Sequence, residues 1–370
     1  MANITTDICG IEFSNPVFTA AGPTAADYKM LLRAKEGGAG GLVTKTISVL
    51  PAKVPIPNIS YFSPNSLLNA ELWSEMDYKK FIYEELTQIK KLGLPVIASV
   101  GYKPEELSIL GKELKGKGLV DAVEFSIHYV DKNAENLRRT AETLKENLDV
   151  PVFPKFSPAV SDIPLAVKML DDVVDGYIAI NSVGPALDFN IKTLKPFLGS
   201  SDGRGWLSGR AILPIGLHFV ASIYTLSKKP VIGVGGIRTA EDVVKYIMAG
   251  ASAVQVCSLA ILKGQNVYGK LAKDLNKWMD DNNYTDIESM RGIFHKQAKP
   301  ASHILYDGAQ VFPEINYQKC DLCGACVKTC VHEALSINEV LILNKDLCAR
   351  CGMCTQICPK DALDMKEETN

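Results

Sequence analysis

Eight of the ten cysteines lie near the C-terminus, in two copies of one spacing. Each copy reads Cys-x2-Cys-x2-Cys-x3-Cys, the first over residues 320–330 and the second over residues 348–358, an offset of 28 (348 − 320). A glycine follows the second cysteine of each copy, at Gly324 and Gly352. Thiolates are soft ligands that stay deprotonated on a metal, so a segment with this spacing folds around the metal that it binds.

This spacing is typical of bacterial ferredoxins with two [4Fe–4S] clusters, in which three cysteines of a run bind one cluster and the fourth binds the other. A chain that carries two such clusters transfers single electrons. We therefore predict two clusters with crossed ligands, one held by Cys320, Cys323, Cys326 and Cys358, the other by Cys348, Cys351, Cys354 and Cys330.

Zinc and disulfides are the alternative uses of clustered cysteines. Zinc sites favour separate Cys-x2-Cys pairs or mixtures of cysteine and histidine, which this repeat does not contain. Disulfides form in oxidising compartments, and the N-terminal stretch has no apolar signal segment, so we expect a cytoplasmic protein. The isolated Cys9 and Cys257 are interpreted as small hydrophobic residues.

The residues before the repeat alternate between short apolar runs and amphipathic stretches. Helical periodicity occurs over 77–92, 132–148, 163–174 and 240–248, and eight strands with intervening helices indicate a (β/α)8 TIM barrel. We predict a barrel over residues 1–312 and a small α+β ferredoxin domain over 313–370. The expected barrel strands are 17–21, 41–44, 96–100, 122–125, 152–155, 176–181, 230–234 and 253–257.

Composition excludes several classes of partner. The net charge is −2 and charged residues make up 22% of the chain, so no basic excess indicates a nucleic acid or a membrane surface as partner. No apolar run approaches the length of a transmembrane span. The same charge balance argues against an RNA-reducing enzyme.

Active sites of such barrels lie at the C-terminal ends of the strands, and phosphate sites often follow strands 7 and 8. Gly235 and Gly236 follow the seventh expected strand, and Cys257 and Ser258 end the eighth, so their backbone N–H groups are candidates for holding a phosphate. Two strands end in lysines that are predicted to face an anionic or electron-rich cofactor ring, Lys45 and Lys155.

The barrel resembles class 1 dihydroorotate dehydrogenases and the pyrimidine-reducing domain of dihydropyrimidine dehydrogenases. The latter also carry a C-terminal two-cluster ferredoxin unit, and members of the family are often homodimers. The resemblance rests on residues 15–22, Lys45-Thr46, and the segments 154–158, 180–184, 207–212 and 233–237.

The resemblance implies that an FMN binds in the barrel mouth and that a small-molecule substrate binds beside it. The FMN would contact the phosphate residues named above and a set of residues at the other strand ends: Ala20, Ala21, Gly22, Lys45, Thr46, Lys155, Asn181, Ser182 and Gly209. Substrate contacts would come from Asn69, Ser126, Asn181 and Ser182.

The active-site loop departs from the family. Where relatives have Asn-Leu-Ser-Cys-Pro, this chain has Ser-Ile-His-Tyr-Val over residues 126–130, so the catalytic cysteine is replaced by Tyr129. A phenol with a pKa near 10 stays protonated and serves as a proton donor. We predict Tyr129 as the catalytic acid, with His128 as the rival. Because amides that hold a pyrimidine are missing, we expect a substrate other than dihydroorotate, uracil or thymine.

We therefore expect an FMN- and iron–sulfur-dependent oxidoreductase that acts on the C=C or CH–CH bond of a small activated substrate. No G-x-G-x-x-G follows a strand, which argues against direct binding of a nicotinamide cofactor. The electron partner would then be a ferredoxin or an NAD(P)H-oxidising flavoprotein subunit. Two alternatives stay open, a dihydropyrimidine or dihydroorotate dehydrogenase and an electron-transfer subunit without a substrate of its own.

Overall fold

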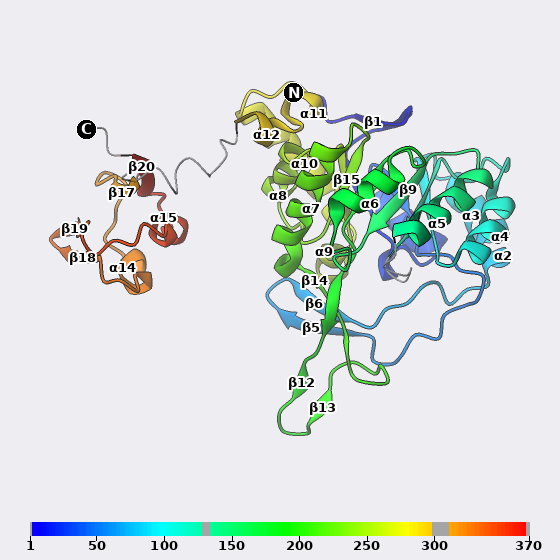
Figure 1. The fold of residues 1–370 in the computed structure, drawn as a ribbon, viewed down its shortest axis with the longest axis horizontal. Coiled ribbons are helices and arrows are strands. Elements are labelled where there is room, and N and C mark those ends of the chain that lie inside the picture. Colours follow the sequence, from blue (N-terminus) through cyan, green and yellow to red (C-terminus); the bar gives the residue numbers. More distant parts are fainter. Residues whose placement is uncertain (1, 128–133, 298–310, 368–370) are drawn as a thin grey trace. The chain divides into compact units, whose positions relative to one another are not determined.

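All eight expected barrel strands are present in a computed structural model, which describes residues 2–127, 134–297 and 311–367 (Figure 1). They form one parallel sheet in the order β3-β16-β15-β10-β9-β8-β7-β4. The middle strands are buried on both faces, which explains why most of their residues are apolar. Their bounds are β3 (Val17–Thr19), β4 (Leu42–Val43), β7 (Val96–Val100), β8 (Ala122–Ser126), β9 (Val152–Phe156), β10 (Tyr177–Ala179), β15 (Val231–Val234) and β16 (Ala253–Val256).

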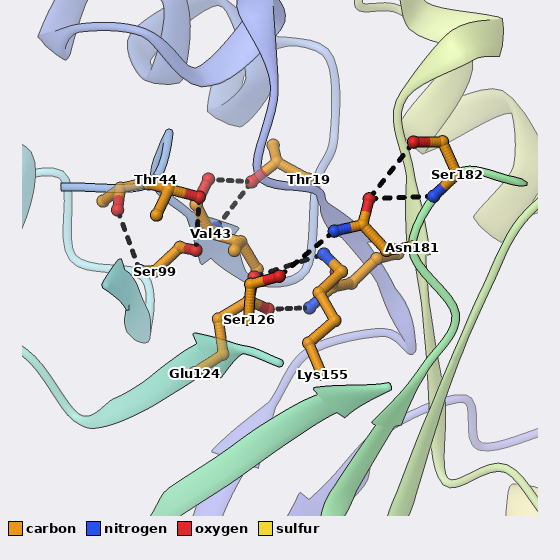
Figure 2. Close-up of polar contacts among 11 residues, drawn as sticks. Thr19, Val43, Thr44, Ser99, Glu124, Ser126, Lys155, Asn181 and Ser182 are labelled. Carbon is orange, nitrogen blue, oxygen red and sulfur yellow. Dashed lines mark hydrogen bonds and ion pairs between the residues drawn. The ribbon is translucent and has the colours of Figure 1, made fainter. Parts of the chain in front are cut away.

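The barrel closes between its first two strands, β3 and β4, with the help of a side chain (Figure 2). The backbone N–H of Thr19 donates to the carbonyl of Gly41 at 3.2 Å. The Thr19 hydroxyl donates to the carbonyl of Val43 at 2.9 Å and accepts from the N–H of Val43 at 2.6 Å. The threonine side chain thus supplies hydrogen bonds between β3 and β4, where the backbone hydrogen bonds between the two strands are few.

Helices cover the outside of the barrel, and α8 (Ala240–Met248) shows why they form where they do. Its N-cap Thr239 accepts from the N–H of Asp242, whose carboxylate accepts from the N–H of Thr239, a reciprocal capping box. The expected helix over 77–92 is split into α2, a π-helical turn η2, and α3. The other helices are η1 (Pro23–Ala25), α1 (Tyr28–Glu36), α2 (Tyr78–Lys80), η2 (Phe81–Glu85), α3 (Leu86–Lys90), α4 (Pro104–Leu114), α5 (Ala134–Glu146), α6 (Ile163–Leu170), η3 (Arg210–Ile212), α7 (Leu213–Leu226), α9 (Ser258–Lys263), α10 (Val267–Asp281), α11 (Ile287–Met290) and α12 (Ile293–Gln297). None of the helices in the described ranges is long and apolar enough to cross a membrane.

Smaller strands absent from the expected pattern build a second, antiparallel sheet in the order β11-β14-β6-β5. Its central pairing places Trp206 opposite Asn69. A hairpin extends away from the barrel strands next to this sheet, and a further strand pair lies near the N-terminus (Figure 1). The bounds are β1 (Thr6–Ile8), β2 (Ile11–Phe13), β5 (Ile59–Ser63), β6 (Ser66–Asn69), β11 (Val183–Ala186), β12 (Phe189–Asn190), β13 (Lys195–Pro196) and β14 (Gly205–Gly209).

The chain divides into two units, residues 1–297 and residues 298–370. The second unit begins its described part with β17 (Val311–Ile315), which pairs along its whole length with β20 (Leu363–Glu367). The predicted domain boundary between residues 312 and 313 therefore falls inside a strand of the second unit. Pairing with a distant strand, which no local pattern reveals, assigns β17 to that unit.

The second unit repeats one backbone conformation in its two halves. Gly324 and Gly352 are left-handed, with φ of 73° and 75°, and they directly precede the helices α14 and α15. A glycine suits this position because an L side chain is strained there. The internal sequence repeat is therefore also a structural repeat. The remaining elements are α14 (Ala325–Thr329), β18 (Leu335–Asn338), β19 (Val340–Leu343) and α15 (Met353–Ile357).

Candidate active site

A cavity of about 1210 Å³, including its open mouth, lies at the C-terminal ends of the barrel strands. The antiparallel sheet contributes to its wall through β5, β6 and β14. Every residue predicted to contact FMN lines it: Ala20, Ala21, Gly22, Lys45, Thr46, Lys155, Asn181, Ser182, Gly209, Gly235, Gly236, Cys257 and Ser258.

Lys155 reaches the cavity from β9 and is held by two buried partners (Figure 2). Its ammonium group lies 3.2 Å from Glu124 Oε1 and donates to Gln255 Oε1 at 2.8 Å. Gln255 in turn donates through Nε2 to Glu124 Oε2 at 2.7 Å. All three side chains are almost fully buried, so this closed network fixes the position of the ammonium group below the cavity.

Asn181 is oriented by its neighbours at the end of β10 (Figure 2). Its Nδ2 donates to Ser126 Oγ at 3.3 Å, and its Oδ1 accepts from the N–H of Ser182 at 2.8 Å. Ser126 is buried and does not line the cavity, so its hydroxyl supports Asn181 from behind. Asn69 lines the cavity and donates to the carbonyl of Trp206 at 3.1 Å, which ties its side chain to β14.

A second charged pair lies in the cavity wall and was not anticipated. Lys45 Nζ lies 2.9 Å from Glu71 Oε2, and Asn58 Nδ2 donates to Glu71 Oε1. Sequence reasoning missed Glu71 because the segment after β4 reads as a loop. The apolar pair Leu67-Leu68 just before Asn69 was the only local signal of the strand β6 that carries this segment to the cavity.

The end of the cavity near β15 and β16 has the features of a phosphate cradle. Gly235 and Gly236 both have positive φ, at 119° and 75°. A Cβ on Gly236 would lie 2.6 Å from Leu213 Cβ, and one on Gly22 would lie 2.6 Å from Cys257 Sγ. At residue 236 only glycine fits, because φ is positive and the added Cβ would also collide with the backbone of Leu213, so the backbone can approach a ligand closely. These residues therefore fit the FMN phosphate and its adjoining chain.

Cys257 borders the same end of the cavity as a neutral thiol. Burial raises the pKa of Cys257 to about 11. A thiol that stays protonated at neutral pH brings no negative charge close to a phosphate.

Substituting Gly236 by alanine tests the cradle. Because the new Cβ would collide with Leu213, the turn must move, and we expect FMN affinity to fall at least about tenfold. Gly93→Ala is the matched control, since Gly93 has a similar φ of 73° and no heavy atom within 4 Å of the added Cβ. FMN retained per chain after gel filtration is the measurement. Equal loss of FMN in both variants would contradict the role of Gly236.

The two residues predicted as proton donors, His128 and Tyr129, lie outside the described residues. Tyr102 lines the cavity, and its ring lies 5.4 Å from that of Trp73. Tyr102 was not singled out from the sequence, because a tyrosine two residues after a strand carries no motif.

The eight clustered cysteines line two separate cavities in the second unit. Among the residues that the structure describes, no three histidine, cysteine, aspartate or glutamate side chains are placed to hold a single metal ion. The four cysteines that line each cavity are the four predicted to bind one cluster, so the two cavities support the predicted ligand assignment. One cavity is lined by Cys320, Cys323, Cys326 and Cys358, the other by Cys330, Cys348, Cys351 and Cys354.

Comparison with known families agrees with both units. The 4Fe-4S binding domain matches twice, over residues 312–335 and 341–364, and each match contains one cysteine run. The second unit therefore holds two [4Fe–4S] clusters. The dihydroorotate dehydrogenase family matches residues 3–279, which include all eight barrel strands.

Individual relatives match the barrel over nearly their whole length. The catalytic subunit of dihydroorotate dehydrogenase B (NAD(+)) from Thermoplasma acidophilum is 33% identical over 303 residues, covering 79% of this chain and 99% of the relative. Its counterpart from Methanocaldococcus jannaschii is 33% identical, covering 79% and 98%, and that from Pyrococcus furiosus is 32% identical, covering 80% and 99%. Since the family match spans the whole barrel, the chain belongs to the dihydroorotate dehydrogenase family of FMN-dependent oxidoreductases acting on CH–CH bonds.

Proposed function

We propose that this protein reduces an activated C=C bond of a small molecule, using electrons that an external donor delivers through the two clusters to FMN. One observation carries the proposal: a single chain contains both a cavity at a barrel mouth, lined by the residues predicted to contact FMN, and two cavities lined by four cysteines each. When bound, FMN supplies the exchange between two-electron hydride chemistry and single-electron transfer.

The chain's own residues bind and orient the reactants. Asn69 and Asn181 line the cavity, and the protein contacts both the Nδ2 and the Oδ1 of each side chain through one or more hydrogen bonds. The rest of their hydrogen-bonding capacity can orient a polar substrate. The buried network around Lys155 fixes its ammonium group beside the cavity, where it would donate to a bound flavin and stabilise negative charge on it.

Proton delivery is assigned to the loop after β8, with Tyr129 as the donor and His128 as the rival. Tyr129→Phe removes only the phenolic hydroxyl, so we expect turnover to fall about 10²-fold or more while FMN content is unchanged. Anaerobic assays of the flavin-reduced protein against enoates, enamides and pyrimidines measure this, with His128→Gln tested alongside. Unchanged turnover of Tyr129→Phe on every accepted compound would exclude Tyr129 as the acid.

The electron donor is proposed to be a ferredoxin or a separate NAD(P)H-oxidising flavoprotein subunit. The relatives are named as catalytic subunits of NAD(+)-dependent enzymes, which favours a partner that handles the nicotinamide. We expect reduced ferredoxin to reduce the protein-bound FMN anaerobically, and NADH alone to leave it oxidised. Rapid reduction of the purified chain by NADH would contradict this prediction.

Dihydroorotate oxidation is the second candidate function, because the relatives that match the barrel carry that name. Oxidation of dihydroorotate by the purified chain would favour it, and reduction of uracil would favour a dihydropyrimidine dehydrogenase. Flavin reduction without turnover of any small molecule, until a partner is added, would instead favour an electron-transfer subunit.

A further inference from the structure

The Glu71 carboxylate lines the cavity two residues after Asn69, on the segment that leaves β6. Its position is determined by three contacts. Lys45 Nζ lies 2.9 Å from Oε2, Asn58 donates to Oε1, and the backbone N–H of Glu71 donates to Asn69 Oδ1 at 3.3 Å. The side chain is only 14% exposed, so water screens its charge poorly.

The charges along the cavity are unevenly distributed. Three cationic side chains line it in the described part of the chain: Lys45, Lys155 and Arg238. Each lysine has a carboxylate partner, Glu71 for Lys45 and Glu124 for Lys155. Arg238 follows the glycine pair of the phosphate cradle, and none of the described residues forms an ion pair with it. The uncompensated positive charge therefore lies at the phosphate end, and the Lys45 end is neutral.

We propose that Glu71 is a specificity-determining residue that makes the active site select uncharged substrates over carboxylates. This inference rests on the proposed function and names the substrate class for it. A substrate carboxylate at the Lys45 end would compete with Glu71 for the ammonium group and lie beside a second negative charge of low exposure. A neutral amide, lactam or carbonyl group can instead accept from Lys45 without displacing Glu71.

A purely structural role for Glu71 makes a different prediction. If the carboxylate only braces Lys45 and Asn58, then replacing it should weaken all ligands alike and leave the ratio between a carboxylate and its amide unchanged. The ratio of the two affinities therefore separates charge selection from bracing.

The experiment compares orotate with its neutral carboxamide, orotamide. Both are titrated into the oxidised holoenzyme under anaerobic conditions, and binding is followed by the change in flavin absorbance. Glu71→Gln keeps the size of the side chain and removes the charge. We expect it to tighten orotate binding at least about tenfold relative to orotamide, because Lys45 is then free to pair with the ligand. No relative gain for orotate in Glu71→Gln would overturn the proposal, whatever the wild-type affinity is.

Two further variants complete the test. Glu75→Gln is the matched control, since it makes the same chemical change four residues later at an exposed position, and it should leave the affinity ratio unchanged. Lys45→Gln leaves the Glu71 charge uncompensated and should weaken orotate relative to orotamide; this variant decides the question if Glu71→Gln does not retain FMN. The binding titrations contain no electron donor, so they do not depend on C=C reduction. If turnover assays show that the protein does not reduce C=C bonds, the measured affinities remain valid.

Discussion

Replacing Cys354 by serine is expected to remove one of the two clusters and to abolish delivery of electrons to the barrel while leaving FMN bound. Cys354 is buried in the small core of the second unit and lines a cavity with Cys330, Cys348 and Cys351. Serine cannot replace a thiolate as a soft ligand. Iron and sulfide per chain should fall by about half or more, and reduction of FMN by reduced ferredoxin should slow by about 10²-fold or more.

Cys9→Ser is the control, because Cys9 is an exposed cysteine of the barrel unit outside both cluster cavities. Stopped-flow absorbance under anaerobic conditions follows the flavin, with a small chemical reductant added in a parallel reaction to bypass the clusters. FMN reduction by this reductant should be equal in wild type and both variants. If Cys354→Ser accepts electrons from ferredoxin at the wild-type rate, the clusters do not lie on the path to FMN.

Replacing Lys155 by methionine is expected to destabilise the barrel by about 3–5 kcal/mol, because the Glu124 carboxylate would stay buried without its cation. Glu124 is fully buried, so water cannot take the place of the lysine. Gln255 would keep its hydrogen bond to Glu124 but carries no charge. Removing both charges, in Glu124→Gln with Lys155→Met, should recover most of the loss.

Urea unfolding followed by tryptophan fluorescence measures this effect for the barrel alone. All three tryptophans, Trp73, Trp206 and Trp278, lie in the first unit, so unfolding of the second unit does not contribute directly to the signal. FMN-free protein should be used, since ligand binding adds to apparent stability. A double variant no more stable than Lys155→Met alone would show that the uncompensated charge is not the source of the loss.

The barrel strands were predictable because burial on both faces leaves a strong local signature. Val96–Val100 and Ala122–Ser126 consist mostly of apolar residues, and every residue in both strands is buried. The cysteine repeat was equally informative, because ligand spacing along the chain is itself the geometric requirement of the cluster. Local sequence therefore determined the class of both units and, through the family resemblance, many of the residues that line the cavity.

Tertiary structure alone decided the parts that depend on partners distant in the sequence. The antiparallel sheet beside the cavity forms through pairing of β6 with β14, more than one hundred residues later, and β17 joins the second unit only through β20. The same holds for charge: Lys45 was identified from the sequence as a cation facing a cofactor, yet Glu71 neutralises it across 26 residues of chain. The energies of strand pairing and of ion pairs depend on distance in space and on burial, and neither can be read from the order of residues along the chain.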